Sequence, residues 1–119
     1  MKWFVLILSF SLSCLELRAQ SDYYERQARS HQNEAAFYVK QAQGYDRDAE
    51  FYMREAASHL RDAEYYQRQK QFEQARSSLR KARNAIERAD DNKRKADNAR
   101  SNAKSYIRRA EDALQNAKK

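Results

Sequence analysis

Two histidines, one cysteine and a set of regularly spaced carboxylates are the residues of this 119-residue chain whose types could do chemistry. His31 and His59 stand four heptads apart, about 42 Å along a helix, so one chain cannot bring both to a common metal ion or catalytic triad. The carboxylates recur at seven-residue intervals, as on the solvated face of a helix. We therefore expect no catalytic, cofactor or metal site and interpret the protein as a non-enzyme.

Cys14 is the only cysteine, and it lies in a distinct N-terminal segment. Residues 1–19 begin with Lys2, continue with an apolar run from Trp3 to Leu15, and offer Ala19 as a small residue before a cleavage site. We predict a secretory signal peptide over 1–19 and a mature chain over 20–119. The run is short for a membrane span, and nothing after it resembles one. Two alternatives stay open: an uncleaved N-terminal anchor, and lipidation of Cys14, which would leave a lipid-anchored envelope protein.

Alanine and a large side chain alternate along one heptad seam in the first half of the chain. The seam contains Ala28, His31, Ala35, Tyr38, Ala42, Tyr45, Ala49, Tyr52, Ala56, His59, Ala63 and Tyr66. Such a seam predicts a long helix that packs against another helix. Proline is absent and there is one glycine, which disfavours sheets with tight turns.

A second heptad seam follows in a different register. We expect it to contain Phe72, Ala75, Leu79, Ala82, Ile86, Ala89, Lys93, Ala96, Arg100, Ala103, Ile107, Ala110, Leu114 and Ala117. A turn near residues 68–71 accounts for the change in register. The prediction is an all-α protein, a long antiparallel helical hairpin or coiled coil with arms over 22–68 and 72–118. In that hairpin Asp46 or Asp48 is a candidate partner of Lys93. The alternative is that Lys93 and Arg100 extend to solvent from an alanine-rich stretch.

Two alternatives to this hairpin stay open: a single long bent helix, and three helices with a turn near Asp90. The segment from Tyr65 to Ala82 is similar to the junction between the helices of a tetratricopeptide repeat, although the similarity does not recur. Against a turn, residues 68–71 include no glycine, proline, asparagine or aspartate.

Positive charge gathers in the second half of the chain. Residues 70–119 have fifteen basic and seven acidic side chains, a balance of +8, whereas residues 20–69 have seven and nine, a balance of −2. The densest basic points are Lys93, Arg94, Lys95, Arg108 and Arg109. This arm is a candidate for binding an anionic envelope surface or an acidic protein.

Four aromatic side chains adjoin the first seam at intervals of fourteen residues: Tyr23, Phe37, Phe51 and Tyr65. They widen the apolar stripe of that arm and predict self-association. Because they lie in the arm that is not basic, the sequence argues against a nucleic-acid surface.

The second arm resembles the alanine-zipper coiled coils of bacterial murein lipoproteins. The resemblance rests on Ala82, Ala89, Ala96, Ala103, Ala110 and Ala117, and on the ending from Asn116 to Lys119. It implies an envelope location and, as in that family, attachment of the C-terminal residue, here Lys119, to peptidoglycan.

Together these patterns predict an exported, periplasmic or extracellular coiled-coil protein with a structural or protein-interaction role in a bacterial cell envelope. The alternative is a basic polyanion-binding or holdase-like periplasmic protein. Salt-sensitive binding to a polyanion would distinguish the two.

Overall fold

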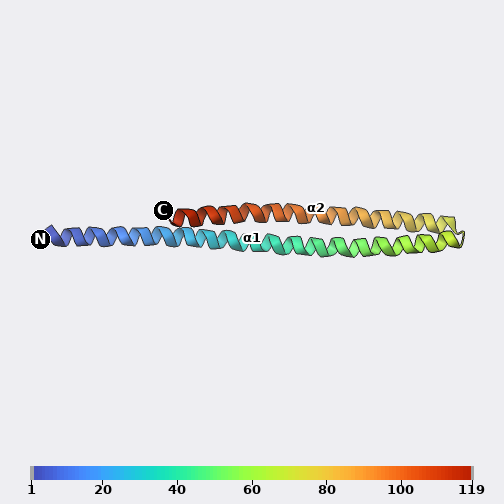
Figure 1. Ribbon diagram of the computed structural model, residues 1–119, viewed down its shortest axis with the longest axis horizontal. Helices are drawn as coiled ribbons and strands as arrows, with labels where there is room; N and C mark the ends of the chain where they lie inside the picture. The colour runs from blue at the N-terminus through green and yellow to red at the C-terminus, as the bar shows by residue number, and fades with distance from the viewer. Residues whose placement is uncertain (1, 119) are drawn as a thin grey trace. The chain divides into compact units, whose positions relative to one another are not determined.

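The computed structural model contains two helices, α1 (Lys2–Arg68) and α2 (Phe72–Ala117). It describes the backbone of residues 2–118 and the side chains of residues 18–118, and none of these residues forms a strand. The chain turns back between the helices, as the change in register predicted, and Figure 1 shows the turn joining them. The two alternatives are not observed, because α2 runs unbroken through Asp90. The all-α hairpin is thus confirmed.

α1 begins at Lys2 and continues through the cleavage position expected after Ala19. The boundary between a signal peptide and a mature chain there stays a prediction. The side chain of Cys14 and the whole of Lys119 lie outside the described residues, so lipidation and wall attachment stay predictions too.

The turn ends α1 without a glycine. The N–H of Gln71 donates to the carbonyl of Tyr66 at 2.8 Å, and the N–H of Lys70 donates to the carbonyl of Gln67 at 3.0 Å. This pair of bonds is a Schellman motif, in which the residue at the position of Lys70 adopts the left-handed conformation. Lys70 does so, with a φ of 56°.

The chain divides into two compact units. One comprises Tyr38–Ser101 and holds the turn; the other comprises the described parts of Met1–Phe37 and Asn102–Lys119. Segments of α1 and α2 pack together in each of them. In the turn unit, Ala42 packs with Ala96 and Ala99. In the other unit, Ala28 packs with Ala110 and Ala113.

Alanine makes up nearly the whole buried core of both units. Every buried apolar residue among those described is an alanine, at most 5% exposed, and the one buried polar residue is Ser78. On α1 they are Ala28, Ala35, Ala42, Ala49, Ala56 and Ala63, as the first seam predicted. The tyrosines and histidines that alternate with them are half-buried. Because alanine has only a methyl group at the contact, the two helix backbones can approach closely. The half-buried tyrosine and histidine rings of α1 flank this contact.

The second seam was predicted correctly at its alanines from Ala75 to Ala110 and wrongly between them, and Ala117 is only half-buried. Phe72, Leu79, Ile86, Ile107 and Leu114 are 38–62% exposed, and Lys93 and Arg100 are exposed as well. The positions that alternate with the alanines in the contact are instead Ser78, Ala85, Asn92, Ala99, Tyr106 and Ala113. The reason is steric. In the turn unit the helices are close enough for alanine methyls to touch, so Ser78, Ala85 and Ala99 face α1 and the larger residue that follows each of the first two is exposed. In the other unit Tyr106 occupies the equivalent position and packs on the ring of His31.

Candidate interaction surfaces

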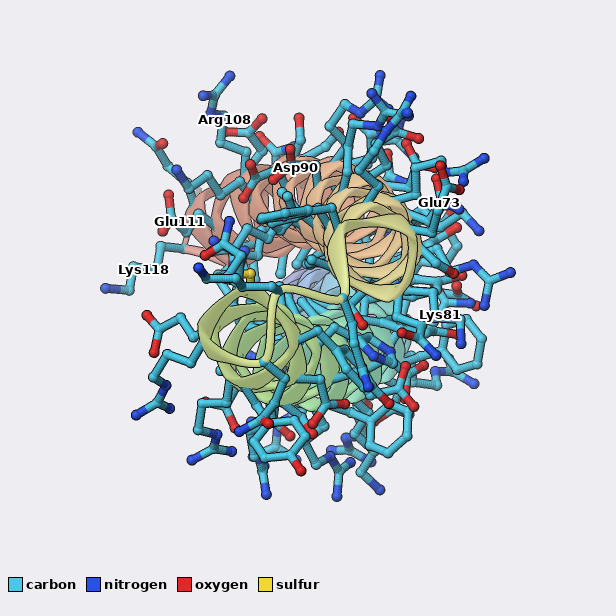
Figure 2. All side chains as sticks on the ribbon, turned by 90° about the vertical axis from the view of Figure 1, so that its right-hand side faces the viewer. Glu73, Lys81, Asp90, Arg108, Glu111 and Lys118 are labelled. Atoms are coloured by element: carbon cyan, nitrogen blue, oxygen red, sulfur yellow. The ribbon has the colours of Figure 1, made fainter. Side chains whose placement is uncertain are left out.

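Two different edges flank the alanine seam in the turn unit. The first, which we call the acidic–basic edge, comprises Asp48 and Glu55 on α1 and Lys81, Arg88 and Lys95 on α2. Glu55, Lys81 and Arg88 line one open depression together with His59. Figure 2 shows Lys81 and Asp90 on different sides of α2, so α2 presents charge to this edge and also away from it.

Cations of this edge lie over tyrosine rings of the first seam. The guanidinium of Arg88 is 5.7 Å from the ring centre of Tyr52, and the ammonium of Lys95 is 5.8 Å from that of Tyr45. Attraction between a cation and an aromatic face contributes about 0.5–1 kcal/mol at exposed sites. The basic side chains of α2 therefore cover the half-buried rings of α1 as well as facing its carboxylates.

The second edge, which we call the aliphatic edge, comprises Met53 and Leu60 on α1 and Leu79 and Ile86 on α2. Their exposed fractions are 43%, 44%, 42% and 38%. Each directly follows a residue of the contact between the helices; these residues are Tyr52, His59, Ser78 and Ala85. Glu55 and Arg88 instead directly precede contact residues, so the four aliphatic residues lie on the other side of the contact. Met53 lines one depression with Asp46 and Lys93. One heptad nearer the turn, the same pairing places Leu60 opposite Ile86.

An ion pair closes the aliphatic edge at its end away from the turn. Arg100 pairs with Asp46 across the two helices, and its Nη1 also donates to Asp97 Oδ1 at 2.9 Å. The hydrogen bond to Asp46 raises the pKa of Arg100 above its ordinary value. The candidate pairing of Lys93 with Asp46 was therefore wrong. Lys93 lines the same depression as Asp46, but the ion pair of Asp46 is with Arg100. The longer guanidinium spans the gap between the helices and holds two carboxylates.

The four aromatic side chains predicted to mediate self-association are all exposed. Tyr23, Phe37, Phe51 and Tyr65 have exposed fractions of 52–55%. Three of them pack edge to face on the tyrosine that follows in sequence, as Phe51 does on Tyr52 with ring centres 5.5 Å apart. They belong to both units, so the structure places them on one row of α1 without assembling them into a single site.

The five basic residues predicted to bind an anionic surface are exposed but not gathered together. Lys93 lies beside the aliphatic edge, Arg94 pairs with Asp91, and Lys95 lies over Tyr45. Arg108 and Arg109 belong to the other unit, where the guanidinium of Arg109 is 4.8 Å from the ring centre of Tyr106.

His31 and His59 belong to different units. The ring of His31 packs against that of Tyr106, with centres 6.0 Å apart, and His59 lines the depression of the acidic–basic edge. Among the described residues, no group of three or more His, Cys, Asp and Glu is positioned to hold a metal ion. Across the same part of the chain, no helix is long and apolar enough to cross a membrane.

No family model, curated protein or solved structure matches this chain. The candidate surfaces therefore rest on the residues and their geometry. The aliphatic edge was not identified in the sequence, because Leu79 and Ile86 were assigned to the seam. The signal that would have found this edge is a leucine or isoleucine directly after a small residue at seven-residue intervals, as in Ser78-Leu79 and Ala85-Ile86.

Proposed function

We propose that this chain is an exported, non-enzymatic coiled-coil protein with a structural or protein-interaction role in a bacterial cell envelope. The observation that supports an interaction role is the distribution of apolar side chains. Among the described residues, the buried apolar side chains are all alanines, whereas large apolar side chains outside the contact, such as Phe51, Met53 and Ile86, are exposed in rows. Exposed apolar rows of this kind favour association with another protein surface. The pattern of residues 1–19 supports export.

The intact mass of the protein isolated from envelope fractions of its native host tests the location. Cleavage after Ala19 removes residues 1–19 and predicts a chain of residues 20–119. Lipidation of Cys14 would add acyl chains, and attachment through Lys119 would add a peptidoglycan fragment that Lys119→Arg abolishes. Recovery of the unprocessed chain, with Met1 and all 119 residues, from the cytosolic fraction would contradict the proposal.

A second candidate function, binding to a polyanion, is favoured by the exposure of the five basic residues. The test is a variant with Lys93, Arg94, Lys95, Arg108 and Arg109 all changed to Glu, assayed on anionic lipid vesicles and on lipopolysaccharide. A polyanion binder should lose binding in this variant, and binding by the parent should weaken steeply as salt rises.

The matched control reverses five basic residues in one row of α1: Lys40, Arg47, Arg54, Arg61 and Arg68. Both variants change the net charge by the same amount, so only a local binding surface distinguishes them. Equal binding by the two variants and the parent would exclude the polyanion function and leave the interaction role.

A further inference from the structure

The aliphatic edge is flanked on α2 by a row of charges with an ordered sign. Within the turn unit, this row contains at seven-residue intervals Arg76, Arg83, Asp90 and Asp97, all exposed. Two cations are followed by two anions. A row of this kind is complementary to itself only when it runs antiparallel to a second copy, because a parallel copy in register would place like charges together.

The charges of this row are largely available for a partner. Among the residues that the structure describes, Arg76, Arg83 and Asp90 form no ion pair within the chain, while Asp97 shares Arg100 with Asp46. Arg76 and Arg83 surround Leu79 in an open depression. Arg76 and Arg83 therefore border the apolar surface near the turn. Asp90 and Asp97 border it one and two heptads beyond, on the outer side of Lys93.

We infer that a second copy of this chain docks antiparallel on the aliphatic edge of the turn unit, with Ile86 of each copy meeting at a two-fold axis. The inference rests on the proposed interaction role and names its partner. Arg83 then faces Asp90 of the partner copy, and Arg76 faces its Asp97. Leu60 and Ile86 of both copies then form an apolar contact at the axis, and Leu79 of each copy packs on the aliphatic stem of Lys93 of the other.

The residues of α1 agree with this arrangement. With the axis at the level of Ile86, Leu60 lies at the same level and meets its own copy. The row of α1 residues next to the aliphatic edge contains Ala57 before Leu60 and Glu64 after it. Glu64 of one copy therefore faces Ala57 of the other, and no like charges oppose each other there. A parallel dimer instead stacks α2 on α1 of the partner and brings Asp97 near Glu50.

Charge reversal tests the pairing by sedimentation equilibrium. The double variant Arg76→Asp with Arg83→Asp makes the row wholly acidic, and Asp90→Arg with Asp97→Arg makes it wholly basic. Each alone should raise the dimer dissociation constant at least tenfold, with helicity unchanged by circular dichroism. An equimolar mixture of the two should form a heterodimer, and the fourfold variant should self-associate like the parent. Reversed variants that dimerise as tightly as the parent would overturn the inference.

Cross-linking tests the axis independently of these charges. Ile86→Cys should form a disulfide-linked dimer under mild oxidation, several-fold above the parent chain, whose Cys14 sets the baseline. Glu87→Cys is the matched control, since it is the next residue on α2 and turns about 100° away. Phe51→Cys reports association through the aromatic row. Linkage at Phe51 or Glu87 equal to that at Ile86 would overturn the inference. Neither readout depends on cellular location, so the proposed envelope role can fail without affecting the result.

Discussion

At the residue scale, the chain places its only glycine where helix is required and a lysine where glycine is favoured. Gly44 lies inside α1, whereas Lys70 holds the left-handed position of the turn. Both choices oppose local preference, since glycine weakens helix interiors and a side chain disfavours the left-handed region. The hairpin forms because packing on both sides of the turn outweighs these two local costs.

Lys70→Gly should stabilise the hairpin by about 1 kcal/mol, because it removes the clash of a side chain in the left-handed region. The measurement is the urea midpoint of the parent and the variant. Lys81→Gly is the control: at an interior position of α2 it should destabilise by about 1 kcal/mol. A lower midpoint for Lys70→Gly would contradict the turn geometry.

Gly44→Ala should stabilise α1 by about 0.5–1 kcal/mol, since a Cβ at this position meets nothing within 4 Å. The readout is thermal unfolding followed by circular dichroism. Combined with Lys70→Gly the gains should add, because the two sites share no contact. A loss of stability would show that Gly44 faces a surface not present in the single chain.

At the element scale, alanine periodicity determined the pairing of α1 with α2, but not the full rotation of α2. The seven-residue beat of alanine predicted both contacting helices, and the change of beat located the turn. The intervening positions of α2 were wrong because Leu79 and Ile86 are the more apolar choice, whereas Ser78 and Ala85 are the side chains that fit. Apolarity alone predicts the buried position only when the helices are far enough apart to hold a branched side chain. The aliphatic edge was missed for the same reason.

Ala89→Leu tests this close approach. Ala89 is fully buried in the contact, so the larger side chain should force the helices apart and destabilise by about 1–3 kcal/mol. Ala36→Leu is the matched control, as it adds the same atoms at an exposed position of α1 outside the proposed interface and should change stability by less than about 0.5 kcal/mol. Denaturant unfolding gives both values. Equal effects at the two sites would mean that α2 is rotated differently.

At the scale of the whole molecule, the two helices divide the charge between them. The more acidic α1 and the basic α2 face each other along the acidic–basic edge, where Glu55 lies with Lys81 and Arg88. Opposite charges on that edge and apolar side chains on the other distinguish the two sides of the hairpin. The aliphatic edge, which is suited to a partner, is thereby separated from the acidic–basic edge, whose opposite charges favour the pairing of α1 with α2.

A double-mutant cycle between Glu55→Lys and Arg88→Glu should show that division. Each single change places like charges together, and the double variant restores the attraction, with a coupling energy of about 0.2–1 kcal/mol for an exposed pair. Urea unfolding at low and high salt measures it, and the coupling should shrink at high salt. The control cycle joins Glu55→Lys to Arg94→Glu, whose guanidinium pairs with Asp91, and should give none.

The alanine seam has a consequence for how sequence change can proceed along this chain. Alanine has no side-chain rotamers, so the buried contact loses no side-chain entropy on folding and cannot relax by repacking. Only glycine is smaller, and glycine weakens the helix, while side chains larger than serine, which fits at Ser78, would have to force the helices apart. Substitution is therefore destabilising in both directions at the fifteen buried alanines of the described residues and tolerated better on the two edges. A chain of this design can change what it binds while the spacing of its helices stays the same.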